Sequence, residues 1–94
     1  MEISVDKEII SSGEPVTYTF KLRNKGDGDL TDVELIDDQF GIIVAGLTLK
    51  KGEIKAFNHT AVLSVAKKNC AEATAKYDGE SIGARACIIV EIRT

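Results

Sequence analysis

The stretch "NCAEATAKYDGESIGARAC", from Asn69 to Cys87, constrains the fold of this chain more than any other feature. At its centre is Asp78-Gly79, and an Asp-Gly pair between alternating residues is the strongest short-range signal for a β-hairpin with a two-residue turn. Pairing outward from this turn places Cys70 directly opposite Cys87. The segment therefore predicts two antiparallel strands in one fixed register.

That register predicts a disulfide between Cys70 and Cys87. The residues flanking a two-residue turn form a hydrogen-bonded pair, and alternation then makes the cysteines a non-hydrogen-bonded pair with Cα atoms about 4.5 Å apart. A disulfide accepts roughly 4.4–6.8 Å, and closing a loop of this size stabilises by about 3 kcal/mol in the chain-entropy model. Two reduced thiols on an exposed face are the alternative. Redox catalysis is not expected, because the chain lacks a Cys-x-x-Cys motif.

The distribution of apolar residues supports the same pairing. One side of both strands is apolar, which predicts a core face, while Glu72 opposes Arg85 on the other side as a charge pair worth about 0.2–1 kcal/mol. The predicted core-facing residues are Ala71, Ala73, Ala75, Tyr77, Ile82, Ala84, Ala86, Ile88, Val90 and Ile92.

The rest of the chain repeats with period two, which is typical of half-buried strands. Apolar residues alternate from Val16 to Leu22, shorter strands are expected around 3–9 and 33–35, and a longer one at 54–65 with a bulge near Ala56. Residues 40–49 fit one strand or two. We therefore predict an all-β fold: a single Ig-like antiparallel β-sandwich of about seven strands, forming one domain over residues 1–94.

Composition limits the partners and the compartment. A net charge of −3 and a pI near 5.1 argue against nucleic acid or an anionic membrane, and no apolar run approaches the roughly 20 residues of a membrane span. The start, "MEISVDKEII", lacks a signal-peptide pattern, which leaves a cytoplasmic protein or a domain of a longer secreted chain. The predicted disulfide favours an extracytoplasmic location, at the cell surface or secreted.

Few residues suggest chemistry. His59 is the only histidine and is expected at the rim of the core, and no nucleophile–base or phosphate-loop motif occurs, so we predict neither an enzyme nor a cofactor. We predict no metal site, because Asp, Asn and Gly also simply form turns. The alternative is a calcium site, since clustered loop carboxylates supply oxygen ligands; its candidate ligands are Asp27, Asp29, Asp32, Asp37 and Asp38.

The sequence bears on two covalent modifications. Asn58-His59-Thr60 is an N-x-T sequon on the outward side of its strand, so Asn58 is a candidate glycosylation site. An intramolecular isopeptide bond needs a buried lysine beside an asparagine and a carboxylate, and the last strand, "ARACIIVEIRT", contains no asparagine.

The chain resembles the conserved repeat domain of bacterial and archaeal cell-surface proteins. The resemblance rests on "SGEPVTYTFKLRNKGDGDLTDVELIDD", "GLTLKKGEIKAF" and the cysteine-containing segment. Two features depart from that family: the loop at 40–47 is short, and the cysteine pair is not part of the general pattern. The residues that match it are Gly13–Thr19, Asn24, Gly26, Asp27, Leu30, Thr31, Val33, Asp37 or Asp38, Leu49, Gly52 and Glu53.

That resemblance implies an Ig-like or fibronectin-like sandwich, a surface location and tandem repetition, with no catalysis and no fixed ligand. The leading functional hypothesis is accordingly a non-catalytic spacer or structural module whose partners are neighbouring repeats. The alternative is an adhesion or recognition module that binds glycan or protein through its loops or an edge strand. A cytoplasmic adaptor with free thiols is the third option.

Overall fold

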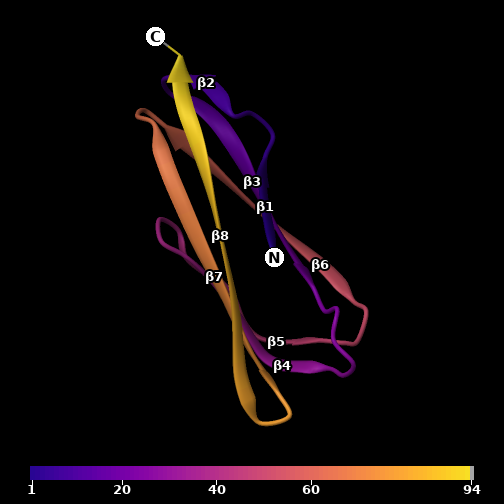
Figure 1. The fold of residues 1–94 in the computed structure, drawn as a ribbon. Coiled ribbons are helices and arrows are strands. Elements are labelled where there is room, and N and C mark those ends of the chain that lie inside the picture. Colours follow the sequence, from indigo (N-terminus) through magenta and orange to yellow (C-terminus); the bar gives the residue numbers. More distant parts are fainter. Residues whose placement is uncertain (94) are drawn as a thin grey trace.

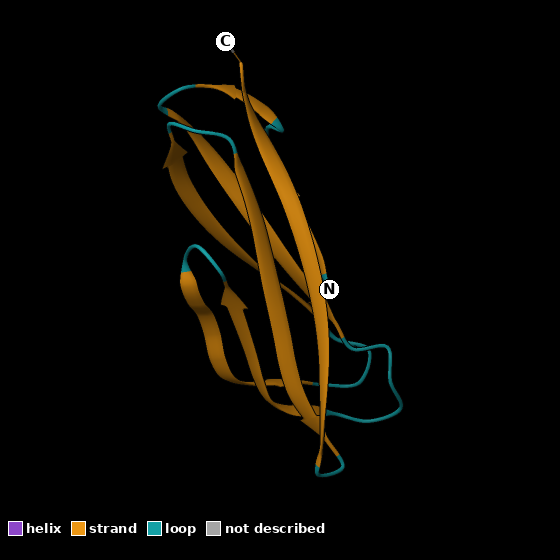
Figure 2. Cartoon of the chain, turned by 60° about the vertical axis from the view of Figure 1, so that its left-hand side comes forward, coloured by secondary structure: helices purple, strands orange, loops and turns teal. Residues whose placement is uncertain are grey.

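The computed structural model describes residues 1–93, which form eight β-strands in two layers (Figures 1 and 2). A three-stranded sheet has the order β1-β3-β6, and a five-stranded sheet has the order β2-β8-β7-β4-β5. The molecule is elongated, with dimensions of 49 × 19 × 16 Å. The strands are β1 (Glu2–Val5), β2 (Ile9–Ser11), β3 (Glu14–Arg23), β4 (Leu30–Asp37), β5 (Gly41–Leu49), β6 (Ile54–Leu63), β7 (Lys67–Tyr77) and β8 (Glu80–Arg93).

The predicted all-β sandwich is confirmed, with eight strands in place of about seven. The additional strand is β2, which pairs with the end of β8 in parallel, so the five-stranded sheet is not purely antiparallel. Within β2, Ile10 is fully buried while Ile9 is half exposed. A strand of three residues carries too little alternation to be recognised from sequence, which is why the prediction merged it with the first strand.

The predicted register of the hairpin is confirmed over its whole length. Strands β7 and β8 pair without interruption from Tyr77↔Glu80 to Lys67↔Val90, with Cys70 opposite Cys87. Asp78 and Gly79 both have positive φ, 51° and 80°, as a type I′ turn requires. A disulfide joins the two cysteines, whose Cα atoms are 4.0 Å apart.

The predicted core face is correct for most residues of the hairpin, including buried Ala75, and wrong for three residues toward its tip. Tyr77, Ile82 and Ala84 are exposed, the first two at 38% and 45%. Figure 1 shows that the tip of the β7–β8 hairpin projects past the ends of β3 and β6, so the other sheet covers this part of the hairpin incompletely. The core itself centres on a fully buried set comprising Ile10, Val16, Tyr18, Phe20, Leu35 and Val90.

Irregularity occurs in a different strand from the one predicted. β3 and β6 keep one register from Glu14↔Leu63 to Arg23↔Ile54, so the expected bulge near Ala56 is absent. Ala56 and Ile54 simply face solvent, and the exposed fraction of Ile54 is 46%. The register shifts lie instead in β4, against both β5 and β7, where Asp32 has φ 50°. Residues 41–49 form one strand.

Removal of the disulfide tests how much the hairpin contributes to stability. We expect a Cys70→Ala/Cys87→Ala double variant to lose about 3 kcal/mol of unfolding free energy, because the cross-link closes a loop that the unfolded chain otherwise leaves free. Urea unfolding of the oxidised protein and of the variant measures the difference. Adding reductant should destabilise the wild type and leave the variant unchanged; equal midpoints for the oxidised wild type and the variant would contradict the expectation.

Candidate functional site

A chain of buried polar side chains joins the two sheets. The Tyr18 hydroxyl of β3 donates to Asn69 Oδ1 of β7 at 3.2 Å, and Asn69 Nδ2 donates to Asp37 Oδ1 of β4 at 3.1 Å. All three residues are at most 1% exposed. Burying these groups is costly unless they bond one another, so the chain fixes how the three-stranded sheet sits on the five-stranded sheet.

The same carboxylate organises the turn that follows β4. Asp37 Oδ1 accepts hydrogen bonds from the backbone N–H groups of Gln39 and Phe40, at 2.8 and 3.1 Å. Asp38 Oδ1 accepts from the Cys70 N–H at 3.1 Å, which ties the turn to the disulfide. Burial raises the pKa of Tyr18, and the neighbouring Asp37 charge raises it further. The hydrogen bonds that Asp37 and Asp38 make here therefore join β4 and its turn to β7.

A Tyr18→Phe substitution tests this link through its pH dependence. The raised pKa means that the unfolded chain releases the phenolic proton at lower pH than the folded protein, so wild-type stability falls as pH rises above the ordinary value near 10. The variant should lack that part of the decline. At neutral pH it should lose about 1–3 kcal/mol, because Asn69 Oδ1 loses its phenolic donor. Urea unfolding between about pH 8 and 11 measures both effects, and parallel pH profiles would contradict the assignment. The other tyrosine, Tyr77, is exposed and is present in both the wild type and the variant, so it does not distinguish their pH profiles.

A second polar centre lies where the β3–β4 loop meets the β5–β6 turn. Asn24 is 2% exposed and its Nδ2 donates to the carbonyl oxygens of Gly28 and Leu49, at 2.8 and 3.0 Å. Its Oδ1 accepts from the Gly26 N–H, and its backbone exchanges hydrogen bonds with Gly52 and Glu53. Asn24 thus holds the β3–β4 loop against the β5–β6 turn. These hydrogen bonds give a structural reason for four residues of the motif, because each takes part in pairing buried or loop backbone groups. The four residues are Asn24, Gly26, Gly52 and Glu53.

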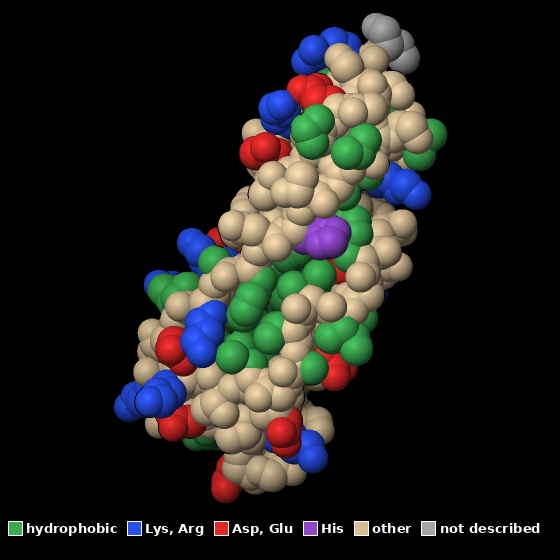
Figure 3. All heavy atoms as spheres, turned by 180° about the vertical axis from the view of Figure 1, so that it is seen from behind, with side chains coloured by type: hydrophobic (Ala, Val, Ile, Leu, Met, Phe, Trp, Pro, Cys, Tyr) green, Lys and Arg blue, Asp and Glu red, His purple; other side chains and the backbone are tan. Residues whose placement is uncertain are grey.

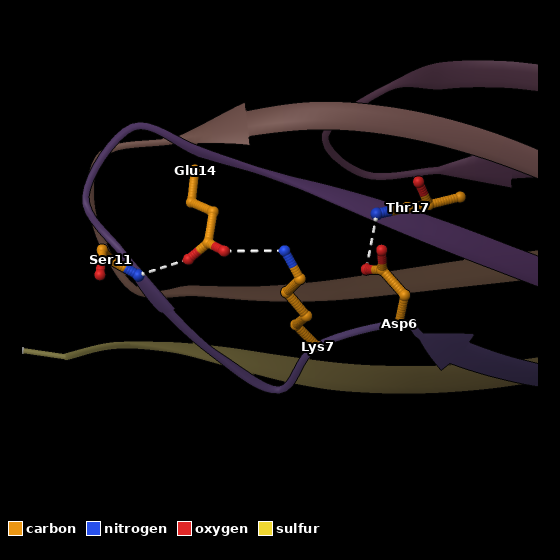
Figure 4. Close-up of polar contacts among 5 residues, drawn as sticks. All are labelled: Asp6, Lys7, Ser11, Glu14 and Thr17. Carbon is orange, nitrogen blue, oxygen red and sulfur yellow. Dashed lines mark hydrogen bonds and ion pairs between the residues drawn. The ribbon is translucent and has the colours of Figure 1, made fainter.

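The motif before β3 also has a structural basis. Glu14 accepts from the Ser11 N–H and from Lys7 Nζ, at 2.9 and 2.7 Å, while Asp6 accepts from the Thr17 N–H (Figure 4). The lysine lowers the pKa of Glu14 and the Ser11 N–H lowers it further, whereas Glu14 raises the pKa of Lys7. These contacts are solvent exposed, so they shape the corner leading into β3 and form no enclosed site.

An Asn24→Ala substitution should be strongly destabilising. It removes both amide hydrogen bonds and leaves the Gly28 and Leu49 carbonyl oxygens short of a donor, for an expected loss of about 2 kcal/mol. Thermal or urea unfolding measures the loss. The matched control is Asn58→Ala, at an exposed position of β6, which should change stability by no more than about 0.5 kcal/mol. Similar losses for both variants would contradict the role of Asn24.

The candidate calcium ligands fall into separate groups. Asp27, Asp29 and Asp32 lie in or near the loop before β4, and Asp29 Oδ1 accepts from the Lys51 N–H. Asp37 and Asp38 lie at the other end of β4, roughly 20 Å away at about 3.3 Å per residue. Within residues 1–93 no group of three or more acidic, histidine or cysteine side chains is arranged to hold a metal ion.

The sequon lies on β6 and includes the histidine, with Asn58 and His59 on opposite sides of the strand. Asn58 is exposed and its Oδ1 accepts from the Thr19 hydroxyl at 3.0 Å. His59 is half-buried, and its ring lies 4.1 Å from the ring of Phe40. Figure 3 shows a band of hydrophobic side chains running beside the histidine. The histidine therefore packs at the rim of the core, and glycosylation of Asn58 stays a prediction.

An apolar cavity of about 130 Å³ opens between the sheets beside β8. Its floor comes from both sheets, including Leu22, Val33 and Leu49. Sequence analysis missed this cavity, although the signal was available: alanine and glycine recur along β7 and β8 and leave little side-chain volume to fill the space between the sheets. The residues lining the opening on that side are Ala73, Ala75, Ile82, Gly83 and Ala84.

Comparisons with known proteins define the fold alone. No protein-family model matches the chain, and no curated protein matches its sequence. A solved structure that it resembles is the crystal structure of Spo0M, a sporulation control protein from Bacillus subtilis, with a TM-score of 0.62 and 16% identity. The match covers 99% of this chain and 48% of that one, so the chain spans about half the length of Spo0M. The resemblance to surface repeat domains therefore stays a prediction.

Proposed function

We propose that this domain is a non-catalytic structural module of an extracytoplasmic protein, acting as a rigid unit that spaces neighbouring segments. The observation that carries the proposal is the Cys70–Cys87 disulfide within an elongated sandwich. Disulfides persist in oxidising compartments, and small domains use them to supplement a limited core. Among residues 1–93 there is no helix long and apolar enough to cross a membrane.

Internal rigidity is what a spacer requires, and three features supply it. The disulfide ties β7 to β8, the Tyr18–Asn69–Asp37 chain ties one sheet to the other, and Asn24 ties two loops together. Spo0M contains a matching sandwich within a chain about twice as long, so this fold can serve as one unit of a larger protein. Membership of the surface repeat family, with sister repeats as partners, is part of the proposal.

The proposal predicts the state of the cysteines and the exposure of the domain in native cells. Intact cells are treated with a thiol-alkylating reagent and digested, and we expect one disulfide-linked peptide containing Cys70 and Cys87. Protease added outside the cells should reach the domain. Recovery of both cysteines alkylated, in material protected from external protease, would overturn the assignment to an extracytoplasmic module.

A domain exchange tests the spacing role itself. In the native protein, residues 1–94 are replaced by an unrelated disulfide-bonded sandwich of similar length, and antibody access to the adjoining segments is measured on intact cells. A spacer should be replaceable without loss of access, whereas a matched deletion should reduce it. Loss of access in the exchanged protein would contradict a purely spacing role.

A further inference from the structure

The outer edge of β8 is an open strand edge next to an apolar cavity. On one side β8 pairs with β7 from Glu80 to Val90, but on the other side β2 reaches only Glu91–Arg93. From Ser81 to Ile89 no strand within residues 1–93 pairs with this edge. In the opposite sheet β1 is an edge strand, and Met1, which precedes it, also lines the cavity. The cavity therefore opens between the two sheets beside Ile82, Gly83 and Ala84, within the part of β8 that is unpaired on its outer side.

Backbone groups along this edge point away from β7 in a regular pattern. The turn at Asp78-Gly79 makes Tyr77 and Glu80 a hydrogen-bonded pair, so alternate residues of β8 beyond it bond to β7 and the others do not. The N–H and C=O groups that point outward belong to Ser81, Gly83, Arg85 and Cys87. Gly83 has no side chain to obstruct an approaching backbone.

Side chains of the same edge open onto the cavity. Ile82 and Ala84 have the opposite parity to the outward-bonding residues and line the cavity, and Ile82 is 45% exposed. A strand added beside β8 would direct every second side chain into this space. The volume of about 130 Å³ and the apolar lining suit an aliphatic side chain. The edge and the cavity therefore form one site.

Basic residues at the edge of the cavity, here called the rim, favour an added strand that carries acidic side chains. Arg23 lines the cavity, and Lys21 and Lys25 share an adjoining hollow with it, whose acidic member is Glu2. None of the three cations makes a salt bridge within the described residues. This rim is positive although the chain as a whole has a net charge of −3. Arg85 is less available, because Glu72 lies directly opposite it on β7.

We propose that the β8 edge from Ser81 to Cys87 binds an extended peptide segment of another protein by strand addition, taking aliphatic side chains into the cavity and carboxylates against the basic rim at Arg23. Backbone hydrogen bonds supply part of the affinity, and the cavity and rim supply selectivity. Strand addition would also cover the exposed Ile82 and close the opening of the cavity between the sheets. This assignment goes beyond the spacer role and does not depend on the compartment.

A synthetic peptide of about eight residues is the probe, in titrations by calorimetry and by NMR of backbone amides. Its residues of one parity are valine with one aspartate, so that both kinds of side chain face the cavity and its rim, and its residues of the other parity are threonine. We expect saturable binding, with amide shifts concentrated between Ser81 and Cys87. A peptide with lysine replacing aspartate should bind about tenfold more weakly, and so should one with proline replacing the central valine. Absence of binding, shifts confined to other strands, or equal binding of the lysine peptide would each overturn the proposal.

Paired variants separate the contributions. Ala84→Glu places a charge at the cavity and should weaken binding about tenfold or more, whereas Ala45→Glu, an exposed alanine on β5, should not. Arg23→Glu should weaken binding severalfold and Lys68→Glu should not. Melting curves establish that each variant is folded. Equal affinities within both pairs would overturn the proposal, as would sedimentation showing that the free chain already pairs β8 with a second copy.

Discussion

The register between β7 and β8 is the constraint on which the rest of the structure depends. Eleven consecutive pairs, closed by a two-residue turn, decide which side of the hairpin faces the core. A shift of one residue would turn every core side chain to solvent and separate the two sulfur atoms. The same register brings Asn69 inward to meet Tyr18 and Asp37. The disulfide, the core face and the buried polar chain thus follow from one local choice of turn.

Local chemistry explains which features could be predicted from the sequence. The Asp78-Gly79 turn and the alternation around it act over short distances, so the hairpin, its disulfide and the strand at 16–22 were predictable. β2 was not, because its three residues are specified by pairing with the distant end of β8. Nor was the regular register of β6, because an exposed Ile54 was interpreted as a core residue needing a bulge.

The candidate sites were harder to predict than the fold, for a physical reason. Asp37 was recognised as a turn carboxylate, but its partners come from β7 and β3, which only the tertiary structure brings together. Asn24 was recognised as part of a motif, and the structure supplies the cause, since its amide satisfies two loop carbonyl oxygens. The cavity depends on side-chain volumes in both sheets, so the small residues of β7 and β8 indicate it only when the facing residues of the other sheet are known.

The position of the disulfide has a consequence for how this chain folds. It joins residues only 17 apart, within one hairpin. The three-stranded sheet, by contrast, pairs Glu14 with Leu63, and the five-stranded sheet pairs β2 with Glu91–Arg93. Contacts between residues close in sequence form at a smaller loss of chain entropy than distant ones. In the oxidised chain the hairpin therefore offers a preformed template, onto which strands from the first two thirds of the sequence can assemble in a later and slower step.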